Sequence, residues 1–338
     1  MKQEVSLQEL KGELEGEEEE SASRSVFKWF FNNIKFLLIP ASRLEELTIR
    51  EREYDKTVSK RSFLKRLKSV LTILGIVIVL YVVTLAIFGA WISPYTFQEA
   101  DAVYNAPLFW AEPSPAHPLG NTYMGRDVYA RMIYGARASL TMALPAIGLS
   151  LICGIFFGIL AGYVGGWLDS IIMRVFDILL AFPALIFAIV FVSIFGRSLS
   201  IIIMAYGVLG IPYYSRLIRG NVLQAKELPY VQAARVSGAK TWRIMFRHIL
   251  PNTIQPIIIS VTLDIGGVIL SFAGLAFLGY SDPDLIEWGR DISDARGHIL
   301  DAPWASLFPG LMIVITVLGF MLLGDGLRDA LDPRLKNL

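Results

Sequence analysis

Residues 139–163 read SLTMALPAIGLSLICGIFFGILAGY and contain no Asp, Glu, Lys or Arg. A helix needs roughly 20 mainly apolar residues to cross the hydrocarbon core of a bilayer, and this run exceeds that length. An open sheet in lipid would leave its backbone polar groups unsatisfied, so we expect a helix. The stretch therefore predicts a transmembrane helix.

Five further apolar stretches share this character, and they lie at 70–92, 178–196, 199–218, 252–279 and 305–324. The whole chain has 338 residues, of which 54% are hydrophobic, with a mean hydropathy of +0.53. We predict an all-α integral membrane protein with six transmembrane helices. The net charge of +1 gives no reason to expect a nucleic-acid partner.

The charges between these spans predict the orientation, because positive residues gather on the cytoplasmic side. Residues 60–68 are rich in Lys and Arg and directly precede the first span, while residues 216–247 carry seven basic side chains against Glu227 alone. Residues 281–303, where counting spans predicts the outer side, carry six acids. We expect a multi-pass protein of the cell membrane with both termini in the cytoplasm.

Three regions follow from composition. Residues 1–25 are acidic and poor in aromatic residues, which predicts a disordered cytoplasmic tail. Residues 26–68 are charged or only briefly apolar, which predicts a cytoplasmic or interfacial segment. Residues 69–338 form the predicted transmembrane domain.

The sequence contains no recognisable catalytic or metal-binding motif. It has no G-x-x-x-x-G-K-[ST] phosphate loop, and His117, His248 and His298 do not have metal-ligand spacing. No nucleophile motif stands out among the serines and acids. We therefore expect neither an enzyme nor a metal site.

The predicted cytoplasmic loop, residues 220–251, carries a local pattern of its own. Pro229 suits the first turn of a short helix and Gly238 suits its C-terminal stop. A second short helix is expected from Thr241 to His248, with Pro251 breaking the chain before the next span. Two such helices would form a rigid protrusion, although an ordinary basic loop explains the charges equally well.

The segment Gln232-Ala233-Ala234-x-x-x-Gly238, followed by Ile249-x-Pro251, resembles the loop motif of ABC importer permeases. Gln232 replaces the usual Glu, and Ile249-Leu250-Pro251 is a contracted form of Ile-x-Leu-Pro. Both departures resemble the dipeptide and oligopeptide branch of that family. Pieces at 117–120, 125–128, 135–140, 169–183 and 324–334 extend the resemblance over residues 60–338.

The resemblance implies a type I importer permease fold and a C-type permease subunit in the inner membrane. It implies a heterodimer with a second homologous permease subunit, two ATPase subunits that bind ATP and Mg²⁺, and an extracellular solute-binding protein. The chain itself would hold no cofactor. The loop residues implied to contact the ATPase are Gln232, Ala233, Ala234, Gly238, Ala239 and Arg243.

The expected function is a translocation path for di- or oligopeptides. Similar permeases carry oligosaccharides or metal chelates, so those solutes remain alternatives. An ion-driven secondary transporter predicts inverted repeats with broken helices, and we see no such duplication in this sequence. A scaffold protein of the membrane predicts no rigid cytoplasmic protrusion.

Two features within the spans complete the set of candidate residues. Gly154, Gly158, Gly162 and Gly166 recur every fourth residue, which favours close helix packing, either within this chain or against another subunit. Asp264 lies near the middle of the fifth span, where a carboxylate costs about 2.5–3.5 kcal/mol on insertion scales. We expect it either to line the translocation path or to be satisfied inside the helix bundle.

Overall fold

The computed structural model describes residues 69–104 and 108–331, which fall within one compact unit, Leu64–Leu338. In these ranges the regular structure is helical, and the β-pairing is a single bridge between Asn121 and Asp127. The predicted tail, 1–25, and the predicted interfacial segment, 26–68, lie outside the described residues, as does the C-terminal end of the family-like stretch at 324–334.

Among the residues that the structure describes, five helices are long and apolar enough to cross a membrane. They are α3 (Val70–Ile92), α5 (Val128–Val164), α8 (Leu199–Ala225), α11 (Leu250–Phe277) and α13 (Trp304–Leu331). Each contains most of one predicted span, and α3 has the predicted bounds. The 37 residues of α5 give a helix about 55 Å long, which exceeds a hydrocarbon core of about 30 Å.

The third predicted span, 178–196, is wrong as a single helix. The chain forms α6 (Gly166–Leu180) and α7 (Ala184–Phe195), which meet at 84°. Pro183 sits at the N-cap of α7, and a proline both lacks the amide hydrogen and restricts the residue before it. With only 12 residues, α7 is too short to span alone, so the six-span fold holds only if this bent pair counts as one span.

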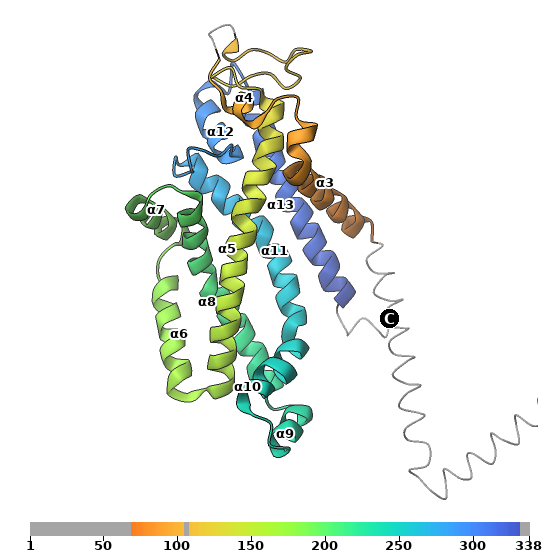
Figure 1. The fold of residues 1–338 in the computed structure, drawn as a ribbon, viewed down its shortest axis with the longest axis vertical. Coiled ribbons are helices and arrows are strands. Elements are labelled where there is room, and N and C mark those ends of the chain that lie inside the picture. The colour runs from red at the N-terminus through yellow and green to blue at the C-terminus, as the bar shows by residue number, and fades with distance from the viewer. Residues whose placement is uncertain (1–68, 105–107, 332–338) are drawn as a thin grey trace, which may run out of the picture. The chain divides into compact units, whose positions relative to one another are not determined.

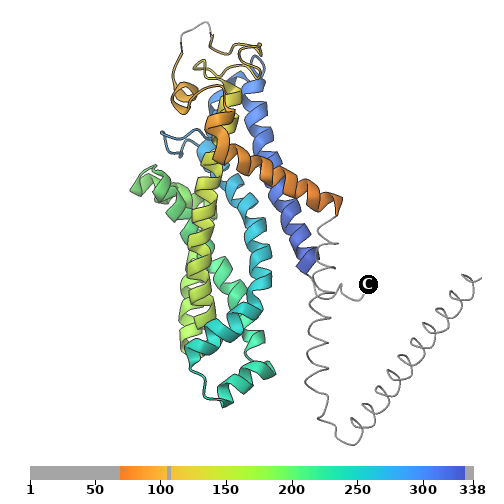
Figure 2. The same ribbon diagram turned by 45° about the vertical axis from the view of Figure 1, so that its right-hand side comes forward.

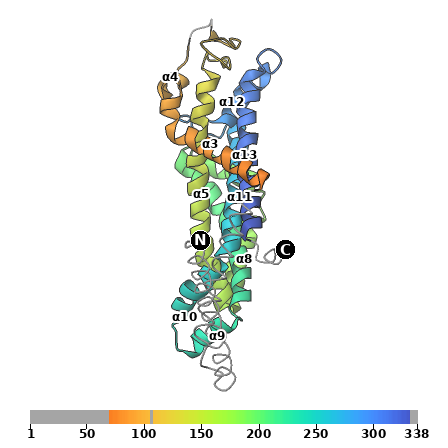
Figure 3. The same ribbon diagram turned by 90° about the vertical axis from the view of Figure 1, so that its right-hand side faces the viewer.

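The long helices run side by side, with α5 between α8 and α11 in Figure 1. Helix α3 crosses α5 and α13 obliquely, which is clearest in Figures 2 and 3. Gly75 and Gly319 permit the close approach of α3 to α13, because a Cβ on Gly75 would lie 2.7 Å from the Leu323 amide nitrogen. Helices α3 and α13 are therefore in close backbone contact, which small residues commonly permit in membranes.

One end of the bundle is closed by a cap, which we define as residues 93–104, 108–127 and 279–303. It contains α4 (Phe97–Asp101), α12 (Trp288–Ala295) and the 3₁₀ turn η3 (Arg296–His298). Buried Arg131 of α5 holds the cap: it donates to Asp291 of α12 at 2.8 Å and to Asp101 of α4 at 3.0 Å.

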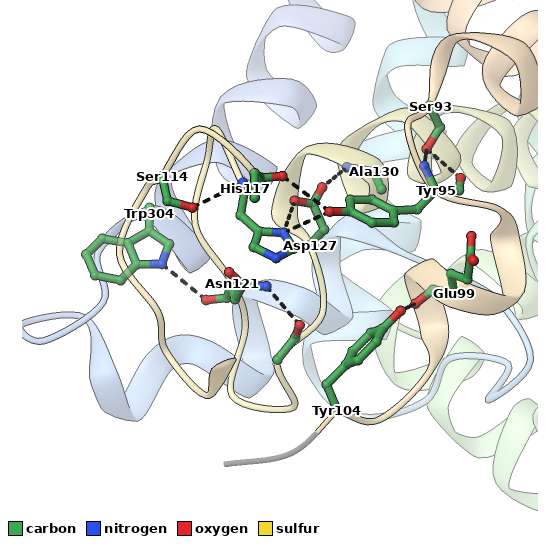
Figure 4. A network of polar contacts seen from close by, with 12 residues as sticks. Ser93, Tyr95, Glu99, Tyr104, Ser114, His117, Asn121, Asp127, Ala130 and Trp304 are labelled. Carbon is green, nitrogen blue, oxygen red and sulfur yellow. Dashed lines mark hydrogen bonds and ion pairs between the residues drawn. The ribbon is translucent and has the colours of Figure 1, made fainter. Parts of the chain in front are cut away.

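A second set of polar contacts organises the cap around the start of α5 (Figure 4). Asp127 caps α5 by accepting from the Ala130 amide at 2.7 Å, and its other oxygen lies 2.9 Å from His117 Nδ1. The ring of Tyr95 stacks on His117, and Trp304 donates from its indole nitrogen to the Asn121 carbonyl. These contacts join three segments that are distant in sequence.

Candidate functional site

The end of the bundle opposite the cap carries a protrusion that we call the knob, residues 229–249 (Figure 1). Its first helix, α9 (Pro229–Val236), has Pro229 in the first turn. Gly238 follows with φ +76°, a left-handed conformation that glycine adopts without strain, and its amide closes the helix by donating to the Arg235 carbonyl. The structure thus places a helix between the two residues that predicted its ends.

The second knob helix differs from the prediction in how it ends. Helix α10 (Thr241–Arg243) runs through a π-helical turn, η2 (Ile244–Ile249), directly into α11. The predicted break at Pro251 is wrong, because Pro251 follows the π-helical turn directly and the chain stays helical through it. The knob is therefore joined to a continuous helical segment, Thr241–Phe277.

The predicted ATPase-contact residues divide into two groups by burial. Gln232, Ala233, Gly238 and Arg243 are exposed, whereas Ala234 and Ala239 are half-buried and pack against the core. Val231 is fully buried and anchors α9. The first group lies open at the knob surface, whereas the second group is partly covered by the packing of the knob.

Two exposed apolar side chains extend the knob surface beyond the predicted residues. Val236 is 89% exposed and Trp242 is 60% exposed, with the Trp242 ring 4.0 Å from the centroid of Phe246. Sequence reasoning missed them, although an isolated Val and Trp in a basic stretch were a visible signal. A contact surface is marked by a contiguous apolar patch and not by single exposed side chains, so these two residues are only added to the candidates on the knob.

The base of the knob is fastened to the neighbouring helices by polar contacts. Arg219 of α8 makes a bidentate pair with Asp169 of α6, with both distances 2.6 Å. Lys226 donates to the Gly162 carbonyl at the end of α5, and Arg235 lies over the ring of Tyr163. Only the Arg235 contact comes from the knob itself, and it ties α9 to the end of α5; the other two hold α8, which leads into the knob, against α6 and α5.

The structure assigns the glycine repeat to contacts inside this chain. A Cβ on Gly154, Gly158 or Gly162 would meet α8 at 2.4, 2.7 and 2.9 Å, respectively. Gly166 does not share this packing: it begins α6 with φ +62°, and no atom lies within 4 Å of its Cβ position. Three of the four glycines therefore bring α5 against α8.

Asp264 lies on α11 and is half-buried beside the hydroxyl of Tyr214 on α8. Tyr214 itself is almost fully buried, next to Gly154 of α5. Phe272, two turns further along α11, is buried against the ring of Tyr206. Asp264 therefore faces the junction of α5, α8 and α11 and is not brought near the knob.

Within the described ranges, no group of three or more His, Cys, Asp or Glu side chains is arranged to hold a metal ion. The features that the fold presents are a helical membrane bundle, a rigid knob at one end and a polar cap at the other. These features define a helical membrane protein with several spans.

The comparison with known proteins specifies this class. Residues 154–337 match the family described as the binding-protein-dependent transport system inner membrane component, and the chain belongs to that family. The chain is similar to the dipeptide transport system permease protein of Alkalihalophilus pseudofirmus, with 41% identity over 289 residues, which cover 85% of this chain and 94% of that protein.

A second group of relatives is named for a different solute. The glutathione transport system permease protein of Pectobacterium atrosepticum is 41% identical over 260 residues, which cover 77% of this chain and 85% of that protein. Its counterpart in Escherichia coli is 39% identical over the same coverage. The predicted family, an inner-membrane ABC importer permease of the peptide branch, is confirmed.

Proposed function

We propose that this chain is one permease subunit of an ATP-driven importer for short peptides. The relatives named above are permeases for dipeptides and for glutathione, which is itself a tripeptide. Oligosaccharide or metal-chelate import, and ion-driven transport, are less well supported by these relatives. The translocation path would form between this chain and a second, homologous permease subunit.

The rigid knob is the observation that carries the coupling part of the proposal. ATP and Mg²⁺ would bind to separate ATPase subunits in the cytoplasm, and a solute-binding protein would deliver peptide at the cap. An ATPase drives transport only by making different contacts with two conformations of the permease pair. Because Thr241–Phe277 is continuous, a displacement of the knob would be carried along α11 into the bundle.

Ala233→Glu tests the coupling role. Ala233 is exposed on α9, so a Glu there adds bulk and charge without filling the core. With the whole transporter reconstituted in proteoliposomes, we expect peptide-stimulated ATP hydrolysis to be lost while the chain remains folded in the membrane. Ala234→Glu is a poorer probe, because half-buried Ala234 also supports the knob itself.

The matched control is Ser170→Glu, at an exposed position of α6 outside both the knob and the cap. It should leave the stimulation of ATP hydrolysis intact. Normal coupling in the Ala233→Glu transporter would refute the assignment of the knob. A reconstituted transporter that imports a disaccharide but neither a dipeptide nor glutathione would refute the peptide assignment separately.

A further inference from the structure

A groove of about 950 Å³ runs along the side of the bundle between α3, α5 and the first turn of α8. Its walls are almost wholly hydrocarbon, contributed mainly by Val83, Ile87, Leu140, Leu144 and Ile203. The Thr141 hydroxyl, the polar group of one wall residue, is bonded to its own helix backbone at Arg137. The other polar groups in the wall are the Trp91 indole nitrogen and the Arg137 guanidinium.

Arg137 differs from the other arginines near the cap. Arg131 and Arg126 pair with carboxylates, Arg290 donates to the Pro283 carbonyl, and Arg197 and Arg296 lie over aromatic rings. Arg137 is exposed, and no carboxylate within 4 Å pairs with it among the described residues. It also borders a second cavity of about 360 Å³ beneath the cap. A guanidinium at the edge of an apolar groove is stabilised when it binds an anion.

The level of Arg137 along α5 narrows the choice of anion. It lies two residues before the charge-free run that starts at residue 139, so it marks the boundary of the hydrocarbon core. Trp91, in the last turn of α3, is 78% exposed and lines the same groove. Tryptophan is enriched at the level of lipid headgroups, so both side chains lie where lipid phosphates lie.

We propose that this groove binds a phospholipid, with its phosphate on Arg137 and an acyl chain between α3 and α5. A peptide fits less well, because its ammonium group would find no acid in the groove wall. A guanidinium suits phosphate, since its planar donors match two phosphate oxygens at once. This site is separate from the knob and does not depend on the identity of the solute.

The experiment uses the complete transporter in nanodiscs of phosphatidylcholine with a minor fraction of phosphatidylglycerol that carries an acyl-chain diazirine. After illumination, mass spectrometry of this chain should find the label concentrated at Leu144 and Ile87. Arg137→Gln should reduce that label about tenfold, as the loss of a charge-assisted contact implies, and Arg137→Lys should retain part of it.

Two controls separate binding from general lipid exposure. Arg296→Gln removes a cap arginine outside the groove and should change nothing. Ala90→Trp fills the groove from an exposed position and should reduce the label although Arg137 is intact. Ile152 on α5, 70% exposed, reports ordinary contact with lipid.

Two results would overturn the proposal. One is equal labelling of Leu144 and Ile152 that Arg137→Gln does not alter. The other comes from p-benzoylphenylalanine placed at Leu144: a crosslink to the second permease subunit instead of lipid would show that the groove is an interface between subunits.

Discussion

Gly158 allows α5 and α8 to pack closely because its side chain is only a hydrogen atom. A Cβ at this position would lie 2.7 Å from the Ser215 carbonyl oxygen and 2.9 Å from the Ile218 Cβ. Backbone cannot yield as a flexible side chain can, so we expect Gly158→Ala to destabilise the protein by about 1–3 kcal/mol. Thermal unfolding in detergent would measure this loss.

Gly148 supplies the matched comparison on the same helix, because no atom lies within 4 Å of its Cβ position. Gly148→Ala should be neutral or stabilising by up to about 1 kcal/mol through helix propensity. If both substitutions lowered the unfolding temperature equally, the contact with α8 would not be the cause.

A role for Asp264 in the translocation path can be tested by substitution, because its neighbour Tyr214 is known. Asp264→Asn keeps the shape of the side chain beside Tyr214 but removes the negative charge. We expect assembly and basal ATP hydrolysis to persist, while the rate of peptide uptake or the preference among peptides changes. Tyr214→Phe removes only the neighbouring hydroxyl and should have a smaller effect. Unchanged uptake of every carried peptide by Asp264→Asn would assign the residue to packing alone.

At the scale of elements, α12 begins with an acid that is poorly suited to its surroundings. Glu287 is the N-cap residue of α12 and is 4% exposed. Burial, with a smaller contribution from Asp282, raises its pKa from 4.5 to about 8. Burial of this side chain therefore favours the protonated form, in which the folded protein is most stable.

The sign of the pH effect follows from that shift. Because the pKa is higher in the folded state, stability falls as the pH rises from about 4.5 to about 8 and then levels off. Glu287→Gln should remove this dependence, so its advantage in unfolding temperature over the native protein should grow across that interval. Asp284→Asn, an exposed acid in the same loop, serves as control. A constant difference at all pH values would exclude titration of Glu287.

The elements also show what the sequence determines locally. Charge-free runs locate α3, α8 and α13 to within two residues at their N-terminal ends, because apolar length alone defines a span. Hydropathy cannot distinguish a straight span from one bent at Ala181-Phe182-Pro183, since both are apolar. Hydropathy also did not predict that the helix continues through Pro251. That continuity depends on the π-helical turn before α11.

For the whole molecule, the orientation in the membrane remains a prediction from charge. A cysteine at Ser237, exposed beside the knob, should react with an impermeant reagent only from the cytoplasm. A cysteine at Leu300, which is 93% exposed in the cap, should react only from outside. Cys153 would first be replaced by Ser, because it is half-buried rather than inaccessible. Labelling of both positions from one side would contradict the topology.

Long-range contacts were the part of the molecule that the sequence did not reveal. The repeat of Gly154, Gly158 and Gly162 indicated close packing, but only the structure identifies α8 as its partner. The same holds for Arg137, whose groove exists only because α3 and α8 flank α5. Periodicity describes one helix face, whereas a site needs two or more faces brought together.

The attachment of the cap through Arg131 constrains the order of events during synthesis. Asp101 is 30 residues upstream of Arg131, but Asp291 is 160 residues downstream. At about 5–20 residues per second, the ribosome delivers Asp291 roughly 10–30 s after Arg131. During that interval Arg131 can pair with Asp101 but not yet with Asp291. The cap can therefore close only after nearly the whole chain has been synthesised.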